Sequence, residues 1–242
     1  TAETFHSDLE NLKNQGVDLS TITAFMIESY HGWGALFYSK EYIQAIKKWA
    51  NENQVIIIFD EIQSGFGRTG KLFAYEHYDV EADLVCCGKG ISSGLPLSAV
   101  LGRKELIDVD PSLNSTHGGN PICCAATLAS LEVLQDENLI SESARKGLLL
   151  EKELIKIKNK YEDRIEIFGK GLVYAIHVKK SGTKEYDVEI VDRIIEKSMQ
   201  KGVLLIRTGT GTIKIGPPLT IFDDALLEGV SVIDESISEC FS

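Results

Sequence analysis

Two ionisable residues stand at the ends of apolar runs, where a folded sheet would present them to a ligand. Asp60 follows the run Val55–Phe59, and Lys89 lies between Gly88 and Gly90, directly after a second apolar run. Open α/β sheets bind ligands at the carboxyl ends of their strands. A partly desolvated lysine amine at such an edge can attack a carbonyl carbon, whereas a lysine in a solvated loop is the ordinary alternative.

Together these two residues meet the needs of one cofactor. A lysine amine can hold the aldehyde of pyridoxal 5'-phosphate as a Schiff base, and an aspartate can keep the pyridine nitrogen protonated so that the ring accepts electrons. A helix N-cap or a surface carboxylate is the alternative role for Asp60. The pair Asp60 and Lys89 therefore predicts pyridoxal 5'-phosphate as the cofactor.

The same region also imitates parts of a nucleoside-triphosphate site. The residues from Gly65 to Lys71 spell G-x-x-x-x-G-K, and Asp60 ends its apolar run as a Walker B aspartate would. A P-loop needs Ser or Thr after its lysine, and it lies between a strand and a helix. Here Leu72 follows the lysine, and the acidic strand runs directly into the glycine loop, so the sequence disfavours a nucleoside triphosphatase.

The composition is that of a globular chain with a small-molecule ligand. The chain has 242 residues, 43% of them hydrophobic, and a net charge of −11, which disfavours binding to nucleic acid or to an anionic membrane. No apolar run approaches the ~20 residues of a membrane span and no signal peptide is evident, so we expect a cytoplasmic protein. The five cysteines form neither a metal-binding pattern nor a disulfide framework, and we expect buried free thiols and no metal site.

Strand and helix patterns alternate along the chain, which predicts an α/β fold. Residues 22–27 indicate a strand, 40–53 a helix and 55–59 a parallel strand buried on both faces, which together make a βαβ unit. Strands are also expected at 83–87 and 98–101, and a helix buried on several sides at 121–134. A domain boundary is expected after residue 135. Beyond it we expect helices at 141–161 and 188–201, strands at 165–168, 172–178, 203–206 and 212–215, and a last helix with Asp223 as its N-cap.

Several long segments resemble the class III pyridoxal-phosphate aminotransferases, the group that contains ornithine and 4-aminobutyrate aminotransferases. The matching segments are FDEIQSGFGRTGKLFAYEHYDVEADLV, GKGISSGLPLSAVLGR, STHGGNPICCAA and IKIGPPLTI. The resemblance runs from about Ala24 onward and corresponds to the carboxyl-terminal part of a usual family member. It implies the fold type I large domain of these transferases, incomplete at its N-terminus, in residues 1–135, and a small α/β C-terminal domain in residues 136–242.

The resemblance also assigns residues to a cofactor site. Lys89 is implied as the residue that forms the Schiff base and moves a proton between the substrate carbon and the cofactor, and Asp60 as the partner of the pyridine nitrogen. Gln63 matches a glutamine near the 3'-oxygen of the ring. Thr116 matches a threonine that reaches the cofactor phosphate of the neighbouring subunit, and a helix-capping threonine is its alternative. A homodimer with shared active sites follows from that match.

Three further residues are implied at the substrate. Glu28 occupies the place of a family glutamate near the substrate, and Lys214 stands where many members carry an arginine for the α-carboxylate. A lysine lacks the planar fork of arginine, which puts bidentate carboxylate recognition in doubt. Arg207 could take over that role, while solvated strand-end charges are the alternative for both cations. Arg68 is expected to make structural hydrogen bonds.

The implied activity is transamination, in which an amino group passes from an amine or amino acid to a 2-oxo acid or an aldehyde. A related pyridoxal-phosphate epimerase, mutase or decarboxylase would use the same Lys89 and Asp60 and is one alternative. The glycine- and serine-rich loop that grips the cofactor phosphate in family members has no counterpart in residues 1–20. A non-catalytic fragment, or a half-subunit completed by an N-terminal half on another chain, is therefore the second alternative.

Overall fold

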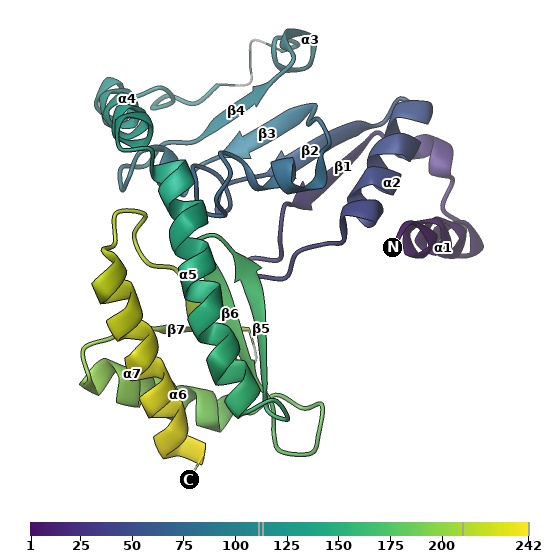
Figure 1. The fold of residues 1–242 in the computed structure, drawn as a ribbon. Coiled ribbons are helices and arrows are strands. Elements are labelled where there is room, and N and C mark those ends of the chain that lie inside the picture. The colour runs from purple at the N-terminus through teal and green to yellow at the C-terminus, as the bar shows by residue number, and fades with distance from the viewer. Residues whose placement is uncertain (111, 113, 210, 242) are drawn as a thin grey trace. The chain divides into compact units, whose positions relative to one another are not determined.

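The computed structural model describes residues 1–242 except 111, 113, 210 and 242, and the chain forms two compact units (Figure 1). The first unit comprises Thr1–Tyr30, Tyr38–Phe66 and Lys71–Glu137. The second comprises His31–Phe37, Gly67–Gly70 and Asn138–Ser242. The predicted division into family domains at 1–135 and 136–242 stays a prediction, because the second unit also takes two short segments from the first half of the chain.

The first unit contains a four-stranded sheet in the order β1-β2-β3-β4. Its strands are β1 (Ala24–Glu28), β2 (Ile56–Asp60), β3 (Leu84–Cys87) and β4 (Ala99–Gly102). β1, β2 and β3 run parallel, and β4 pairs with β3 in the antiparallel sense. The helix α2 (Lys40–Glu52) connects β1 to β2, which confirms the predicted βαβ unit with strand ends displaced by one or two residues.

α2 forms where the sequence combines a cap with a helical apolar stripe. The hydroxyl of Ser39 accepts a hydrogen bond from the N–H of Tyr42, and Ile43, Ile46 and Ala50 are buried along one face. A further helix, α1 (Ala2–Asn14), packs on α2 and was not predicted from the sequence. Its buried residues are Phe5 and Leu9, one helical turn apart, and Thr1 is its N-cap.

The remaining elements of the first unit are short except for one helix. They are the 3-10 turns η1 (Leu19–Thr21), η2 (Ala74–Tyr78) and η3 (Lys89–Ile91), and the helices α3 (Lys104–Ile107) and α4 (Pro121–Asp136). The expectation that the helix at 121–134 is buried on several sides is wrong. Among its residues Cys123 and Leu134 are buried, whereas Ile122 and Leu128 are 72% and 63% exposed. Small and apolar residues favour a helix there, but they do not determine what packs against it.

The second unit is built on an antiparallel sheet with the order β5-β6-β8-β7. The strands are β5 (Ile165–Lys170), β6 (Val173–Val178), β7 (Ile206–Thr208) and β8 (Thr212–Ile215). The helices α5 (Leu139–Lys160), α6 (Val188–Gln200) and α7 (Asp223–Phe241) accompany it (Figure 1). The strand predicted at 203–206 begins only at Ile206. All six residues of β6 are buried, because the apolar faces of the helices and the sheet form one core.

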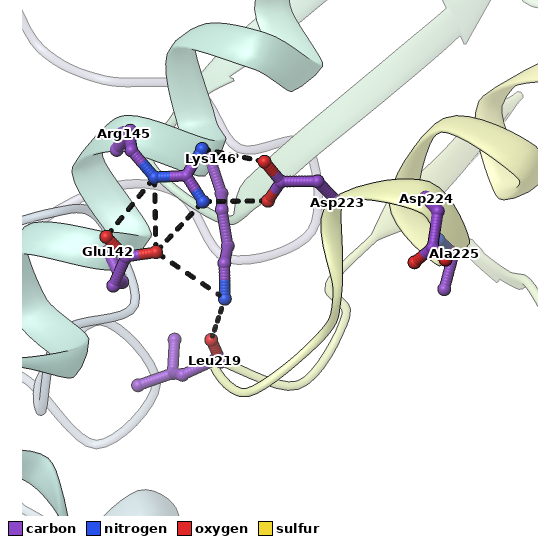
Figure 2. Close-up of polar contacts among 7 residues, drawn as sticks. All are labelled: Glu142, Arg145, Lys146, Leu219, Asp223, Asp224 and Ala225. Atoms are coloured by element: carbon purple, nitrogen blue, oxygen red, sulfur yellow. Dashed lines mark hydrogen bonds and ion pairs between the residues drawn. The ribbon is translucent and has the colours of Figure 1, made fainter. Parts of the chain in front are cut away.

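A polar network joins α5 to the start of α7 (Figure 2). The guanidinium of Arg145 donates to Asp223 at 2.7 and 2.8 Å and to Glu142 at 2.9 to 3.2 Å. The helix α7 begins at Asp223, so the predicted role of this residue as N-cap is wrong, and its carboxylate is instead an ion-pair partner of Arg145. The buried Lys146 donates to the carbonyl of Leu219 at 3.2 Å, which fixes the loop between β8 and α7.

Three features of the described residues bear on the class of protein. None of the helices in the described part of the chain is both long and apolar enough to span a membrane. The described residues also contain no group of three histidine, cysteine or acidic side chains able to hold a metal ion. All five cysteines are free thiols. Cys87, Cys123 and Cys240 are buried as expected, whereas Cys86 and Cys124 are only half-buried.

Candidate active site

The carboxyl ends of the three parallel strands bring acidic residues into one row. Glu28 of β1 pairs in register with Asp60 of β2, which in turn pairs with Cys86 of β3. Neighbouring strands lie about 4.8 Å apart, and Lys89 follows Cys86 after only two intervening residues. Asp60 therefore ends β2, and Lys89 begins the turn η3 just after the adjacent strand β3, at the same carboxyl edge of the sheet.

The carboxylate of Asp60 is held by the chain that follows it. Its Oδ1 accepts a hydrogen bond from the N–H of Ile62 at 2.9 Å, in the manner of an Asx turn. The side chain is half-buried. An acidic group fixed in this way keeps one orientation at the sheet edge, as a partner for a ligand cation requires.

The next residue, Glu61, is fully buried and organises the chain behind the edge. Its carboxylate accepts hydrogen bonds from four groups: the hydroxyls of Ser29 and Ser64 (2.5 Å for Ser64), and the N–H groups of Ala74 and Tyr75, both at 2.9 Å. The sequence analysis did not single out Glu61. The available signal was the acidic doublet at a strand end, since successive residues of a strand point to opposite faces.

Lys89 occupies an unusual backbone conformation. Its φ angle is +44°, in the left-handed region that a residue with a side chain rarely adopts, and the residue is exposed. The turn that carries it is anchored by the buried Ile91 and by the buried Ser92, whose hydroxyl donates to the carbonyl of Leu95. Conformations of this kind cluster at active sites, where the surrounding structure maintains them.

Gln63 and Thr116 are both exposed in the first unit. The Oε1 of Gln63 accepts a hydrogen bond from the buried hydroxyl group of Tyr30 at 3.1 Å, which orients the amide. Thr116 lies in the turn before α4, but the N-cap of that helix is Asn120, whose side chain accepts from the N–H of Ile122 at 3.0 Å. The alternative of a helix-capping role for Thr116 is therefore excluded.

The two predicted substrate cations belong to the second unit, and both have protein partners. The Nε of Arg207 donates to Asp192 at 2.7 Å, and the ammonium of Lys214 donates to the carbonyl of Gly32. Arg68 donates to the carbonyls of Leu172 at 2.9 Å and Pro217 at 2.6 Å, which confirms its predicted structural role. Lys89, Asp60, Gln63, Thr116 and Glu28 all lie in the first unit.

The family of the chain is decided by its sequence pattern. The family model described as Aminotransferase class-III matches residues 1–237. The chain belongs to the class III aminotransferases. This finding confirms the resemblance drawn from the residues around Asp60 and Lys89, and the membership extends over nearly the whole chain.

Named relatives and solved structures agree with this membership. A 4-aminobutyrate aminotransferase of Mycobacterium leprae is 34% identical over 95% of this chain and 52% of its own length. An acetylornithine aminotransferase of Bacillus subtilis is 35% identical over 90% of this chain and 54% of its own. The crystal structure of an S-selective transaminase from Arthrobacter sp. superposes with a TM-score of 0.88 at 28% identity, covering 97% of this chain and 55% of that one. The chain thus has the fold type I architecture and spans about half the length of these relatives.

Proposed function

We propose that this chain carries the lysine-bearing part of a pyridoxal-phosphate-dependent aminotransferase, which moves an amino group from an amine or amino acid to a 2-oxo acid or aldehyde. The observation that supports it most is that Asp60 ends β2 while Lys89 lies in the turn directly after the adjacent strand β3, at the same carboxyl edge. An amine and a carboxylate at one edge of the sheet are the two groups that this cofactor needs, one for its aldehyde and one for its ring nitrogen, so the residues present fit the cofactor.

When bound, the cofactor supplies an electron sink that lowers the barrier to removing a proton from the substrate carbon. In this proposal the Nζ of Lys89 would hold the cofactor aldehyde and would carry the proton removed from the substrate carbon. The carboxylate of Asp60, oriented by the N–H of Ile62, would pair with the ring nitrogen. Gln63 would serve the 3'-oxygen, and Glu28, which is in register with Asp60 on the next strand, would serve the substrate.

The assembly of the site is also part of the proposal. Thr116 would donate its hydroxyl to the phosphate bound by a neighbouring subunit, so that a homodimer shares its active sites. The chain spans about half the length of its relatives, so the groups that grip the phosphate on the other side would come from a further segment of polypeptide. A cytoplasmic location stays a prediction, supported by five free thiols.

Borohydride trapping tests the central assignment. The chain is incubated with pyridoxal 5'-phosphate, reduced and mapped by peptide mass spectrometry, and we expect the cofactor mass on Lys89. The variant Lys89→Ala should lose the label, whereas Lys71→Ala, which removes an exposed lysine of the same unit, should keep it. A label on another lysine in the unaltered chain would overturn the assignment.

A second measurement separates amino-group transfer from the alternatives. With an amine donor and no oxo acid, an aminotransferase converts its cofactor stoichiometrically to the pyridoxamine form, which mass spectrometry of the released cofactor detects. An epimerase, mutase or decarboxylase with the same Lys89 and Asp60 returns the aldehyde form. Accumulation of pyridoxamine supports the proposal, and recovery of the aldehyde alone contradicts it.

A further inference from the structure

Three consecutive carbonyl groups in the second unit are each bound by a different strand. They belong to the turn 31–37, which forms part of that unit and follows β1 along the chain. Lys214 of β8 donates to the carbonyl of Gly32, and Thr208 of β7 donates to that of Trp33. His177 of β6 donates to the carbonyl of Gly34 at 2.9 Å. Carbonyl groups in an irregular turn have no backbone N–H groups of a paired strand to bind, so side-chain donors must satisfy them.

The three donors project from one face of the sheet. His177 and Thr208 are both in register with Thr212, on opposite sides of it, so these three residues form a row across β6, β8 and β7. Lys214 lies two residues beyond Thr212 on the same strand and therefore on the same face. The sheet thus presents the imidazole of His177, the hydroxyl of Thr208 and the ammonium of Lys214 on one face. We call these three residues the donor row.

Two glycines allow the turn and the sheet to approach each other closely. A Cβ atom on Gly34 would lie 3.0 Å from the ring of His177, and one on Gly209, which has φ +56°, would lie 2.7 Å from the ring of Trp33. Within the turn, the N–H of His31 donates to the carbonyl of Leu36 at 2.9 Å. The turn is therefore closed on itself and tied to the sheet at adjacent points.

The chain entering this turn carries a residue of the proposed site. Glu28 ends β1, and the two residues between it and the turn are fixed in the first unit. The hydroxyl of Tyr78 donates to the carbonyl of Ser29 at 2.5 Å, and the hydroxyl of Tyr30 donates to Gln63 at 3.1 Å. The turn thus follows directly along the chain on two residues that hydrogen bonds hold in the first unit.

From these contacts we infer that Lys214, Thr208 and His177 are positioning residues that hold the turn 31–37. Lys214 serves the turn through Gly32 and does not select substrates by their carboxylate. The inference about substrates rests on the proposed aminotransferase function, whereas the inference about the turn does not.

Hydrogen exchange of the unmodified chain and its variants tests the positioning role without any turnover. The amides of His31 and Gly34 are protected by hydrogen bonds inside the turn, so their exchange reports its opening. Lys214→Met and Thr208→Val should each accelerate exchange in the peptide 31–36 by about 5- to 10-fold, the effect of losing one hydrogen bond. The control Lys180→Met, which removes a lysine paired with Glu185, should leave that peptide unchanged.

Two outcomes of this experiment contradict the inference. One is unchanged exchange in both variants, and the other is acceleration spread evenly over both units, which would indicate general destabilisation. Lys214→Arg provides a rescue, because a guanidinium can also donate to the carbonyl of Gly32. Slow exchange in that variant, together with fast exchange in Lys214→Met, supports the inference.

Kinetics with a pair of amines tests the substrate part. The pair consists of an ω-amino acid and the alkylamine of equal length that lacks the carboxylate. Lys214→Met should lower kcat/KM for both amines by the same factor, whereas a loss confined to the amino acid would show that Lys214 binds the carboxylate. Absence of activity in the unaltered chain would count against the aminotransferase proposal alone, because the exchange experiment does not depend on it.

Discussion

The two units of the chain keep their order by different means. In the second unit every residue of β6 is buried, and the helices α5, α6 and α7 pack into the same core. Exposed large apolar side chains occur in both units, for example Met26 (63%) and Leu128 (63%) in the first and Leu148 (68%) and Leu204 (79%) in the second. The units therefore differ in what surrounds their strands: one large apolar cluster encloses β6, whereas polar contacts hold the ends of β2 and β3.

In the first unit, the buried carboxylate of Glu61 and the half-buried carboxylate of Asp83 hold the chain at the strand ends. Glu61 collects four donors near the carboxyl end of β2. Asp83, before the start of β3, accepts from the N–H of Ile57 at 2.9 Å and pairs with Lys47 at 3.2 Å and Arg103 at 3.3 Å. Both ends of the strands that bear Asp60 and Lys89 are therefore fixed by polar contacts, whose geometry is more specific than that of apolar packing.

The largest effect is expected from a cavity in the core of the second unit. Leu150 of α5 is fully buried, so Leu150→Ala should lower the free energy of unfolding by roughly 2–5 kcal/mol. Leu148, in the same helix, is 68% exposed, and Leu148→Ala should change it by less than about 0.5 kcal/mol. Urea denaturation of the two variants measures the difference. Equal effects would show that the core of this unit is not the one described.

In the first unit, a comparable loss of unfolding free energy is expected from a substitution of the buried, polar Glu61. Glu61→Gln keeps the shape of the side chain but replaces one carboxylate oxygen, which accepts from two of the four donors, by an amide NH2 group that cannot accept a hydrogen bond. We expect a loss of about 2–3 kcal/mol, because buried donors are left without a partner. The exposed Glu81→Gln is the matched control and should have little effect.

The two tryptophans allow the units to be followed separately in this experiment. Trp49 belongs to the first unit and Trp33 to the second. In a Trp33→Phe background, the fluorescence of Trp49 should report an earlier urea transition for Glu61→Gln than for the parent. An unchanged transition would show that Glu61 is dispensable for the order of the first unit, and the contrast between the units would fail.

A third prediction uses the one buried histidine of the donor row. Burial lowers the pKa of His177, opposed by its hydrogen bond to Gly34 and by Glu166, and reinforced by Lys179. The neutral ring donates from Nε2 to Gly34 and faces the hydroxyl of Tyr186 at 3.4 Å through Nδ1. Because the unfolded chain binds a proton at higher pH than the folded chain, this contribution to stability is present above about pH 6.5 and is lost as the pH falls toward the lower folded pKa.

His177→Gln keeps a donor for Gly34 and removes the titration. The free energy of unfolding of the unaltered chain should therefore fall below about pH 6.5 more steeply than that of the variant, by at most about 1.4 kcal/mol per pH unit. Denaturation curves at several pH values measure the two slopes. Parallel curves would show that the imidazole is not held neutral in the folded chain.

The features that the sequence analysis predicted are those that short-range patterns determine. The run Val55–Phe59 is β-branched and continuous, and α2 has a helical apolar stripe, so the βαβ unit and the strand-end position of Asp60 followed directly. Lys89 was found because glycines flank it. α1 was missed because its apolar face has only two buried residues, Phe5 and Leu9, in an otherwise polar segment.

Other features depend on contacts between residues far apart in the chain, which no local pattern records. The turn 31–37 joins the second unit through strands that lie more than 140 positions later, His177 to Gly34 among them. His177 itself stands in a strand with every residue buried, where alternation gives no sign of which polar group has a partner. The exposure of α4 likewise depends on long-range packing, because few of the described residues cover this helix. Its apolar sequence suggested that it would be buried.

The smallest effect is expected from the exposed network at the start of α7, which contrasts with the buried carboxylate of Glu61 in the first unit. Arg145 lowers the pKa of Asp223 by hydrogen bonding and by its charge (Figure 2). The stabilisation by this pair is therefore present above the pKa of the aspartate in the unfolded chain and is lost as the pH falls through its pKa in the folded chain. Asp223→Asn should lower Tm only slightly at low ionic strength, and the difference should vanish in about 1 M salt, because exposed charges are screened there.

Asp224→Asn is the control for the ion pair. The carboxylate of Asp224 lies in the same first turn and accepts from the N–H of Ala225 at 2.8 Å, so it also interacts favourably with the helix dipole. It does not make the contacts to Arg145 that Asp223 makes. If the two variants behave alike, the helix dipole accounts for the whole effect and the ion pair for none of it, whereas a salt-sensitive loss in Asp223→Asn alone assigns the effect to Arg145.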